Sequence, residues 1–233
     1  MIVCVWWIGR DLALRLSEYK GTVIALSKTQ KYLDTLKKQD LRIETVCVNL
    51  RNWEETKKAV ESVLPIDLLV NNAGVAVLKP FLELTPEDYD LIFDVNVKAV
   101  MNISQVVAKD LIKRKVGGCI VNLSSQAAEA ALWDHSVYCA SKGALQMFTR
   151  TMALELGQHN IRVNSVNPTV VMTEMGKLGW DDPKKAHEMI SKIPLGRFAE
   201  VAEVVDAVVF MLSDRSSMIS GAALPVDGGF LAT

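Results

Sequence analysis

Short apolar runs alternate with longer helical patterns along most of the chain, and this alternation restricts the possible fold more than any other feature. The runs that have the length and composition of buried strands are residues 22–27, 42–48, 65–72, 119–125 and, as a last strand and turn, 222–229. Helical patterns cover residues 9–20, 30–38, 53–63, 86–114 and 138–157. The alternation predicts an α/β fold, with a Rossmann-like, doubly wound parallel sheet and helices on both faces.

The size and charge of the chain fit one globular domain. It has 233 residues, of which 50% are hydrophobic and 23% are charged, and its formal net charge is −1. We therefore expect a single domain over residues 1–233. The balanced charge offers no basic surface to nucleic acid, so the predicted partners are small molecules and not nucleic acids.

The cysteines and the apolar runs bear on the cellular compartment in which the chain is expected. Cys4, Cys47, Cys119 and Cys139 show no CxxC pair and no metal-ligand spacing, which predicts buried thiols in a reducing compartment and no metal site. No uninterrupted apolar run reaches the ~18 residues of a membrane-spanning helix. The start of the chain lacks the basic region and the cleavage site of a signal peptide. The expected location is the cytoplasm, without a transmembrane segment.

Three residues in the middle of the chain have the chemistry of a proton-transfer site. Ser125 ends an apolar run, and Tyr138 and Lys142 stand four apart in a helical segment, so their side chains share one face. A free phenol loses its proton near pH ~10 and is a poor base at neutral pH. A neighbouring lysine favours the phenolate and is expected to lower its pKa. The tyrosine can then exchange a proton with a substrate oxygen that the serine holds.

Taken alone, this pair is weak evidence. A Tyr-x-x-x-Lys spacing on a helix more often reflects a half-buried ring beside a solvated charge. The functional interpretation therefore depends on the other motifs of the chain.

The end of the second expected strand bears on the choice of cofactor. In dinucleotide-binding folds an acidic residue there binds the ribose hydroxyls of NAD, whereas a basic residue accommodates the phosphate of NADP. This chain has Ser27, Lys28 and Thr29 at that point and no acid. The pattern favours NADP(H), and the alternative is a plain polar loop.

Two further motifs contain asparagine. Asn71-Asn-Ala-Gly74 follows an apolar run, where small residues let a ligand approach the backbone and asparagine side chains can tie strands together. Asn96 lies among apolar residues in the 86–114 helical pattern and needs a hydrogen-bond partner if it is buried. On its own, Asn96 would more often be a structural amide.

With the Asn-Asn-Ala-Gly motif, Asn96, Ser125, Tyr138 and Lys142 in this order, the chain resembles the short-chain dehydrogenase/reductase family from about Gly9 to the C-terminus. The resemblance implies an NADPH-dependent oxidoreductase that transfers hydride to a small ketose or α-dicarbonyl compound. It also implies a homotetramer in which the helices around residues 90–114 and 138–157 and the end of the chain pack between subunits.

The resemblance assigns a role to each motif residue. Tyr138 would be the general acid, Ser125 would hold the substrate oxygen, Lys142 would lower the phenol pKa and bind the nicotinamide ribose, and Asn96 would fix a water in a proton relay. The residues implied around the cofactor are Gly9, Ser27, Lys28, Thr29, Asn49, Leu50, Asn71, Ala73, Gly74, Tyr138, Lys142, Pro168, Thr169, Val171 and Thr173.

An irregular segment over residues 174–194 follows, and it is expected to form a substrate-binding lid with a short helix near residues 184–190. Gln126, His135 and Trp180 are the candidate substrate-binding residues, together with Ser125. The alternative for Trp180 is hydrophobic packing, and for His135 it is a solvated loop position.

The first eight residues depart from the family pattern, which has a glycine-rich turn after the first strand to bring backbone N–H groups against the pyrophosphate. Only Gly9 remains here, and Trp7 stands where a glycine is expected. We expect a truncated or alternatively started chain with a degenerate first strand and glycine loop, although residues 1–5 could still form a short strand.

Two hypotheses follow. The chain is an NADPH-dependent carbonyl reductase, as its catalytic motifs indicate. Alternatively, it is a catalytically weak or inactive family member that acts as an oligomer subunit or scaffold, because the glycine loop is missing.

Overall fold

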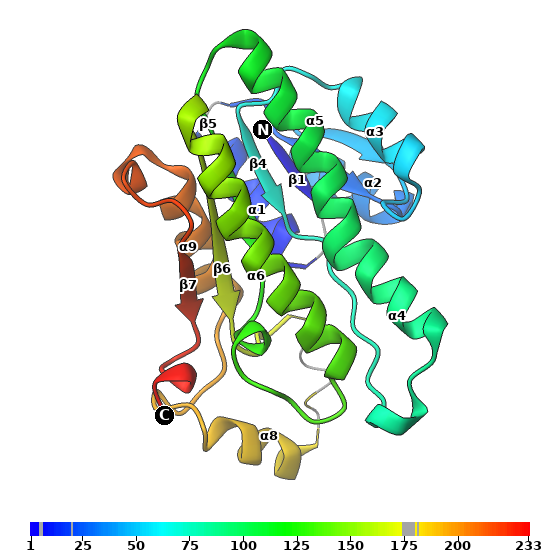
Figure 1. The fold of residues 1–233 in the computed structure, drawn as a ribbon, viewed down its shortest axis with the longest axis vertical. Coiled ribbons are helices and arrows are strands. Elements are labelled where there is room, and N and C mark those ends of the chain that lie inside the picture. The colour runs from blue at the N-terminus through cyan, green and yellow to red at the C-terminus, as the bar shows by residue number, and fades with distance from the viewer. Residues whose placement is uncertain (5–6, 20, 174–179, 181) are drawn as a thin grey trace.

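In the computed structural model, the described residues (1–4, 7–19, 21–173, 180 and 182–233) form a parallel sheet flanked by helices (Figure 1). The sheet has seven strands in the order β3-β2-β1-β4-β5-β6-β7. The strands are β1 (Ile2–Cys4), β2 (Ile24–Ser27), β3 (Glu44–Cys47), β4 (Leu68–Asn71), β5 (Gly118–Leu123), β6 (Ile161–Pro168) and β7 (Ala223–Val226). The predicted Rossmann-like, doubly wound fold is confirmed.

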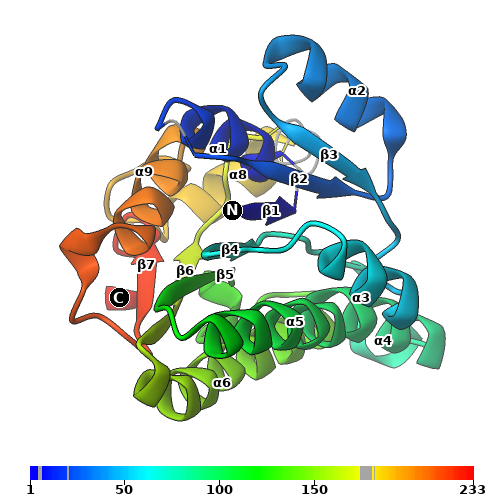
Figure 2. The same ribbon diagram turned by 90° about the horizontal axis from the view of Figure 1, so that it is seen from above.

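Helices cover both faces of the sheet, as Figure 2 shows from above. One face carries α1 (Ile8–Ser17), α2 (Gln30–Gln39) and α9 (Val201–Leu212). The opposite face carries α3 (Trp53–Glu61), α5 (Ala99–Arg114) and α6 (Ser136–Leu156). The shorter α4 (Pro86–Phe93) leads into α5, and α8 (Pro183–Ile190) lies near the carboxyl ends of the strands.

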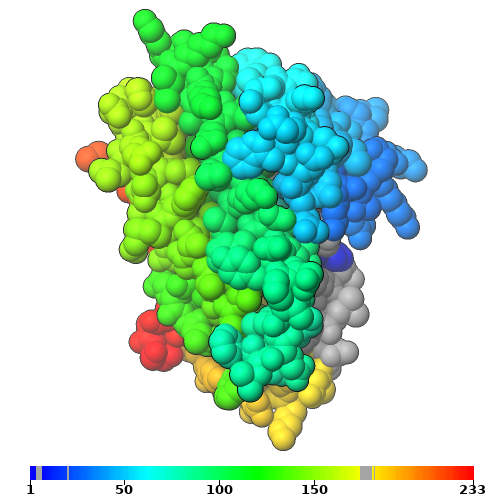
Figure 3. All heavy atoms as spheres, turned by 45° about the vertical axis from the view of Figure 1, so that its right-hand side comes forward, coloured from blue at the N-terminus to red at the C-terminus, as the bar shows by residue number. Residues whose placement is uncertain are grey.

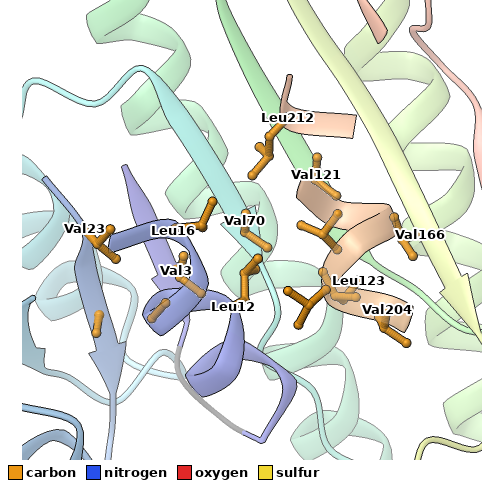
Figure 4. Packing of buried hydrophobic residues seen from close by; sticks show 14 of the residues in the cluster. Val3, Leu12, Leu16, Val23, Val70, Val121, Leu123, Val166, Val204 and Leu212 are labelled. Atoms are coloured by element: carbon orange, nitrogen blue, oxygen red, sulfur yellow. The ribbon is translucent and has the colours of Figure 1, made fainter. Parts of the chain in front are cut away.

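The alternation of side chains along each strand builds two cores. Leu69 and Ile120 point to the layer of α3, α5 and α6, whereas the next residues, Val70 and Val121, point to the layer of α1 and α9. Figure 4 shows the second layer, where Leu12 of α1 packs toward the strands. Because strands buried on both faces need apolar residues at every position, they appear in the sequence as continuous apolar runs.

The helical pattern over residues 86–114 is not one regular α-helix. A π-helical turn, Asp94–Lys98, separates α4 from α5 and contains the buried Asn96. The run Pro86–Arg114 is the one helix in the described part of the chain that is long and apolar enough to cross a membrane by length and composition. Of its most apolar window 56% is buried inside the protein, as in a helix packed against a core.

The first strand lies at the centre of the sheet although it has only three residues. Ile2 pairs with Ile24 of β2 on one side and with Leu69 of β4 on the other, and Val3 pairs with Ala25 and Val70. Strands β1 to β3 follow one another toward one edge of the sheet, and β4 to β7 follow one another toward the other edge. The strand order therefore reverses between β1 and β4. Ligands of open α/β sheets bind at the carboxyl ends of the strands at this point.

The central place of β1 leads to a stability prediction. Val3 is fully buried, so Val3→Asp places an unpaired carboxylate in the core and is expected to destabilise the fold by several kcal/mol, on the order of 3 or more. The measurement is urea denaturation followed by circular dichroism. Val116→Asp is the matched control, because Val116 is exposed. Equal stability of the two variants would mean that residues 2–4 are not part of the sheet core.

Candidate active site

A cavity of about 360 Å³ lies at the carboxyl ends of the strands, where the strand order reverses. The polar residues that line it are Asn72, Ser124, Ser125, Gln126, His135, Tyr138, Lys142, Thr169 and Thr173. The apolar residues that line it include Trp7, Ile8, Leu78, Leu132, Val170, Val171 and Trp180. The cavity therefore brings together residues that are far apart in the sequence, from Trp7 to Trp180.

The predicted Ser-Tyr-Lys set lies on the wall of this cavity. Ser125 follows β5, and its Oγ accepts a hydrogen bond from the backbone N–H of Ala127 at 3.1 Å, which fixes the hydroxyl. The side chains of Ser125 and Tyr138 line the cavity together, and the interaction with Ser125 lowers the pKa of the Tyr138 phenol, against the larger effect of burial. Lys142, one turn along α6, has its Nζ 5.6 Å from the centroid of the Tyr138 ring and donates to the carbonyl of Leu123 at 2.8 Å.

Burial determines the protonation states of Tyr138 and Lys142. It lowers the pKa of the Lys142 ammonium to about 8. Burial also raises the pKa of the Tyr138 phenol above its usual value, and the interaction with Ser125 opposes this only in part. The expected lowering of the phenol pKa by Lys142 is therefore not seen, because desolvation has the larger effect. At neutral pH the tyrosine holds its proton and the lysine remains mostly charged.

Asn96 lies behind the cavity wall and does not line it. Its Oδ1 accepts from the N–H of Val75 at 2.8 Å, and its Nδ2 donates to the carbonyl of Val75 and to Oγ of Ser141, each at 3.0 Å. The side chain thus fixes the backbone at Val75, next to the cavity. A π-helical turn is common at functional sites and here turns Asn96 inward.

Gly74 leaves open the space between Asn96 and Lys142. A Cβ atom at this position would lie 3.6 Å from the Lys142 Nζ and 3.7 Å from the Asn96 Oδ1. Gly74 therefore lies within contact distance of both side chains at the cavity wall.

A second, smaller pocket adjoins the first, with which it shares Gly74 and Val75. Several residues predicted to bind the cofactor line it: Ser27, Lys28, Asn49, Leu50, Ala73 and Gly74. Leu26, Val48, Leu91 and Val95 add apolar walls, which suit a flat ring. We call this the adenosine pocket.

Three predicted cofactor residues lie elsewhere. Asn71 points into the core, where its Nδ2 donates to Oγ of Ser104 and to Oδ1 of Asn122, so it ties elements together and Asn72 lines the cavity instead. Gly9 is buried in the first turn of α1, behind Ile8. Thr29 does not line either pocket, and its N–H donates to Oγ of Ser27.

The substrate end of the cavity contains the predicted Gln126, His135 and Trp180. Gln126 is buried, and its Oε1 has no hydrogen-bond partner among the described residues. The ring of His135 packs edge-on against Tyr138 at 5.9 Å between centroids. Trp180 packs against Phe198, so it contributes both to the cavity and to hydrophobic packing. Within the expected lid over residues 174–194, residues 174–179 and 181 lie outside the described residues, and α8 forms the remaining helix.

Trp7 stands at the start of α1 and lines the large cavity with Ile8. Its φ of 39° is a conformation that bulky side chains rarely adopt. Within the part of the chain that the structure describes, its buried Nε1 has no hydrogen-bond partner. The adenosine pocket and the cavity wall around Tyr138 both fit parts of a dinucleotide. At Trp7, however, the large cavity has an indole where the family pattern has a glycine.

Residues that the sequence did not single out also line the two pockets. Leu78, Leu132 and Val170 border the large cavity, and as apolar loop residues they carry no signal that distinguishes them from core positions. Arg51 borders the adenosine pocket. Its only sequence signal is a basic residue soon after a strand.

Comparisons with known proteins agree with this geometry. A family model described as enoyl-(acyl carrier protein) reductase matches residues 7–231. The L-xylulose reductase of Mesocricetus auratus is 58% identical over 226 residues, which cover 97% of this chain and 93% of that protein. The D-erythrulose reductase of Gallus gallus is 51% identical, with 97% and 92% covered. A crystal structure of a gluconate 5-dehydrogenase from Burkholderia cenocepacia J2315, in complex with NADP and tartrate, superimposes with a TM-score of 0.94 at 27% identity, covering 100% of this chain and 94% of that one.

The buried lysine leads to a prediction about pH and stability. The pKa of Lys142 is about 8 in the folded protein, against ~10.4 for a free lysine, so keeping the charge in the fold destabilises it by about 3 kcal/mol below pH ~8. Lys142→Met is expected to raise the free energy of unfolding at pH 7 by about 1–3 kcal/mol. As pH rises from ~8 to ~10.4 the wild type loses this penalty and the difference shrinks. Urea denaturation at several pH values measures it; a difference that does not change with pH would contradict the assignment.

Trp7 leads to a prediction about cofactor binding. Trp7→Gly removes the indole from the cavity and suits the positive φ, so NADPH is expected to bind roughly tenfold more tightly, equivalent to about 1.4 kcal/mol. A titration followed by nicotinamide fluorescence gives the Kd. Trp133→Gly is the matched control, because Trp133 is 92% exposed and does not line the cavity. Weaker binding by Trp7→Gly would instead make the indole a favourable contact of the cofactor.

Proposed function

This chain belongs to the short-chain dehydrogenase/reductase family, and from that premise we propose that it is an NADPH-dependent reductase of small ketoses and α-dicarbonyl compounds, of the L-xylulose reductase type. The observation that carries the proposal is that Ser125, Tyr138 and Lys142 line one cavity wall, with the Lys142 Nζ 5.6 Å from the centroid of the Tyr138 ring. The names of the similar reductases support the same substrate class.

The proposed reaction uses each residue in the protonation state that the structure gives it. The nicotinamide cofactor, when bound, supplies the hydride that reduces the carbonyl carbon. Ser125 holds the carbonyl oxygen, and Tyr138 donates its proton to that oxygen as negative charge develops. A phenol that keeps its proton at neutral pH suits this direction. Lys142 stabilises the resulting phenolate by its charge and would hold the ribose of the cofactor.

The preference for the phosphorylated cofactor rests on the adenosine pocket. Lys28 lines it directly after β2, where an acidic residue would select NAD. The neighbouring Ser27 and Asn49 are uncharged. A 2′-phosphate beside Lys28 would therefore meet positive charge.

The substrate space combines polar and apolar surfaces. Gln126 and His135 offer groups that can hydrogen-bond a second oxygen of a sugar or dicarbonyl compound. Leu78, Leu132 and Trp180 supply apolar surface to the same cavity. This mixture suits a short carbon chain with two or more oxygens.

The proposal extends to a homotetramer in the cytoplasm. Figure 3 shows the outer face on which α3, α5 and α6 lie side by side. On α6 this face exposes Met147 and Leu154, and the latter is 83% exposed. Apolar residues exposed on long helices fit packing against a second subunit.

The decisive experiment is a titration of the purified chain with NADPH, followed by oxidation of NADPH in the presence of L-xylulose or diacetyl. We expect binding and turnover in the wild type. In Tyr138→Phe, which loses the proton donor, kcat should fall by roughly 10²- to 10⁴-fold while NADPH still binds. Tyr89→Phe, outside the cavity, is the matched control. A folded wild type that binds no NADPH would instead support the scaffold hypothesis.

A further inference from the structure

Arg51 lies at the mouth of the adenosine pocket. Its side chain is 46% exposed, and it lines the pocket together with Asn49 and Leu50 of the same loop. The backbone N–H of Arg51 donates to Oδ1 of Asn49 at 3.2 Å, which fixes the loop that carries it. The guanidinium is therefore held at the pocket while one side remains open to a ligand.

Asp94 holds the guanidinium in place from the other side of the pocket. Its Oδ2 accepts from Nε and Nη2 of Arg51 at 3.3 and 3.4 Å. Its Oδ1 accepts from Nζ of Lys98 at 2.9 Å. Two cations share this one carboxylate, so a net positive charge remains at the group.

The walls next to Arg51 are apolar. Leu26, Val48 and Leu50 come from the ends of the neighbouring strands, and Leu91 and Val95 come from the helical segment that contains Asp94. A planar guanidinium beside an apolar slot is suited to the face of an aromatic ring. The carboxylate of Asp94 would repel a phosphate group that approached the same guanidinium, whereas it would not repel a neutral ring.

We infer that Arg51 is a cofactor-binding residue of this chain and that its guanidinium lies against the adenine ring, where Asp94 positions it. The inference rests on the proposed function, since it deepens the description of the same cofactor site. Asp94 opens the π-helical turn that contains Asn96. The Arg51–Asp94 pair therefore joins the adenosine pocket to the segment that fixes Val75 at the catalytic cavity.

The test compares Arg51→Met with Lys98→Met. Each substitution removes one cation and one partner of Asp94, but Lys98 does not line the adenosine pocket. The Kd values of NADPH, NADH and adenosine 5′-monophosphate are measured by calorimetry. Arg51→Met is expected to weaken all three by a similar factor, about five- to tenfold, and Lys98→Met is expected to leave them unchanged. Arg51→Lys, which keeps the charge but loses the planar group, should lie between.

The outcomes separate the inference from the function on which it rests. Equal affinities in the wild type and Arg51→Met would overturn the inference while leaving the reductase intact. A loss confined to NADPH would also overturn it, because it would place the guanidinium on the 2′-phosphate. A wild type that binds none of the three probes would contradict both the inference and the proposed function. Circular dichroism of each variant confirms that a lost affinity is not lost folding.

Discussion

A chain of buried hydrogen bonds beneath the cavity holds the catalytic elements in one arrangement. Asn71 of β4 donates to Asn122 of β5 at 2.8 Å, and Asn122 donates to Oγ1 of Thr149 in α6 at 2.9 Å. All three side chains are almost fully buried, so breaking one bond would leave a polar group unsatisfied in the core. The bonds fix α6, which carries Tyr138 and Lys142, relative to the end of β5, after which Ser125 follows. The relative positions of Ser125, Tyr138 and Lys142 thus depend on buried contacts outside the cavity lining.

The same burial that rigidifies this region determines its electrostatics. Lys142 is surrounded by protein and is only 4% exposed, which is an unfavourable place for a charge. The carbonyl of Leu123 accepts from its Nζ and compensates in part. A functional lysine in this position lowers the stability of the fold, a common relation at active sites. The phenol of Tyr138 is neutral in the same surroundings and is stabilised by them.

The sequence was sufficient to predict the fold and the grouping of Ser125, Tyr138 and Lys142 in one site, for clear physical reasons. Strands buried on both faces leave continuous apolar runs, and the parallel order of such strands brings their carboxyl ends together. Ser125, Tyr138 and Lys142 stand at such ends or on the helix that follows, and their chemistry is visible from residue type.

Other features depend on tertiary contacts that a linear pattern does not record. The π-helical turn at Asp94 interrupts no apolar periodicity, so the 86–114 pattern resembles one helix. Whether Asn71 or Asn72 faces the cavity is decided by the side of the strand on which each falls. The direction of the Tyr138 pKa shift follows from how deeply the ring is buried, and the place of Arg51 follows from its pairing with Asp94 across 43 residues.

The position of β1 has a consequence for the order of folding. Its partner Leu69 of β4 is far along the chain from Ile2, and β2 lies on its other side. The chain between Ile2 and Leu69 must lose conformational entropy before their pairing contributes stability. Such long-range contacts therefore form more slowly than local ones. The first strand of the chain therefore pairs with β4 late in folding. The site at the carboxyl ends of β1 and β4 forms only after this pairing. Binding competence should consequently appear late in folding.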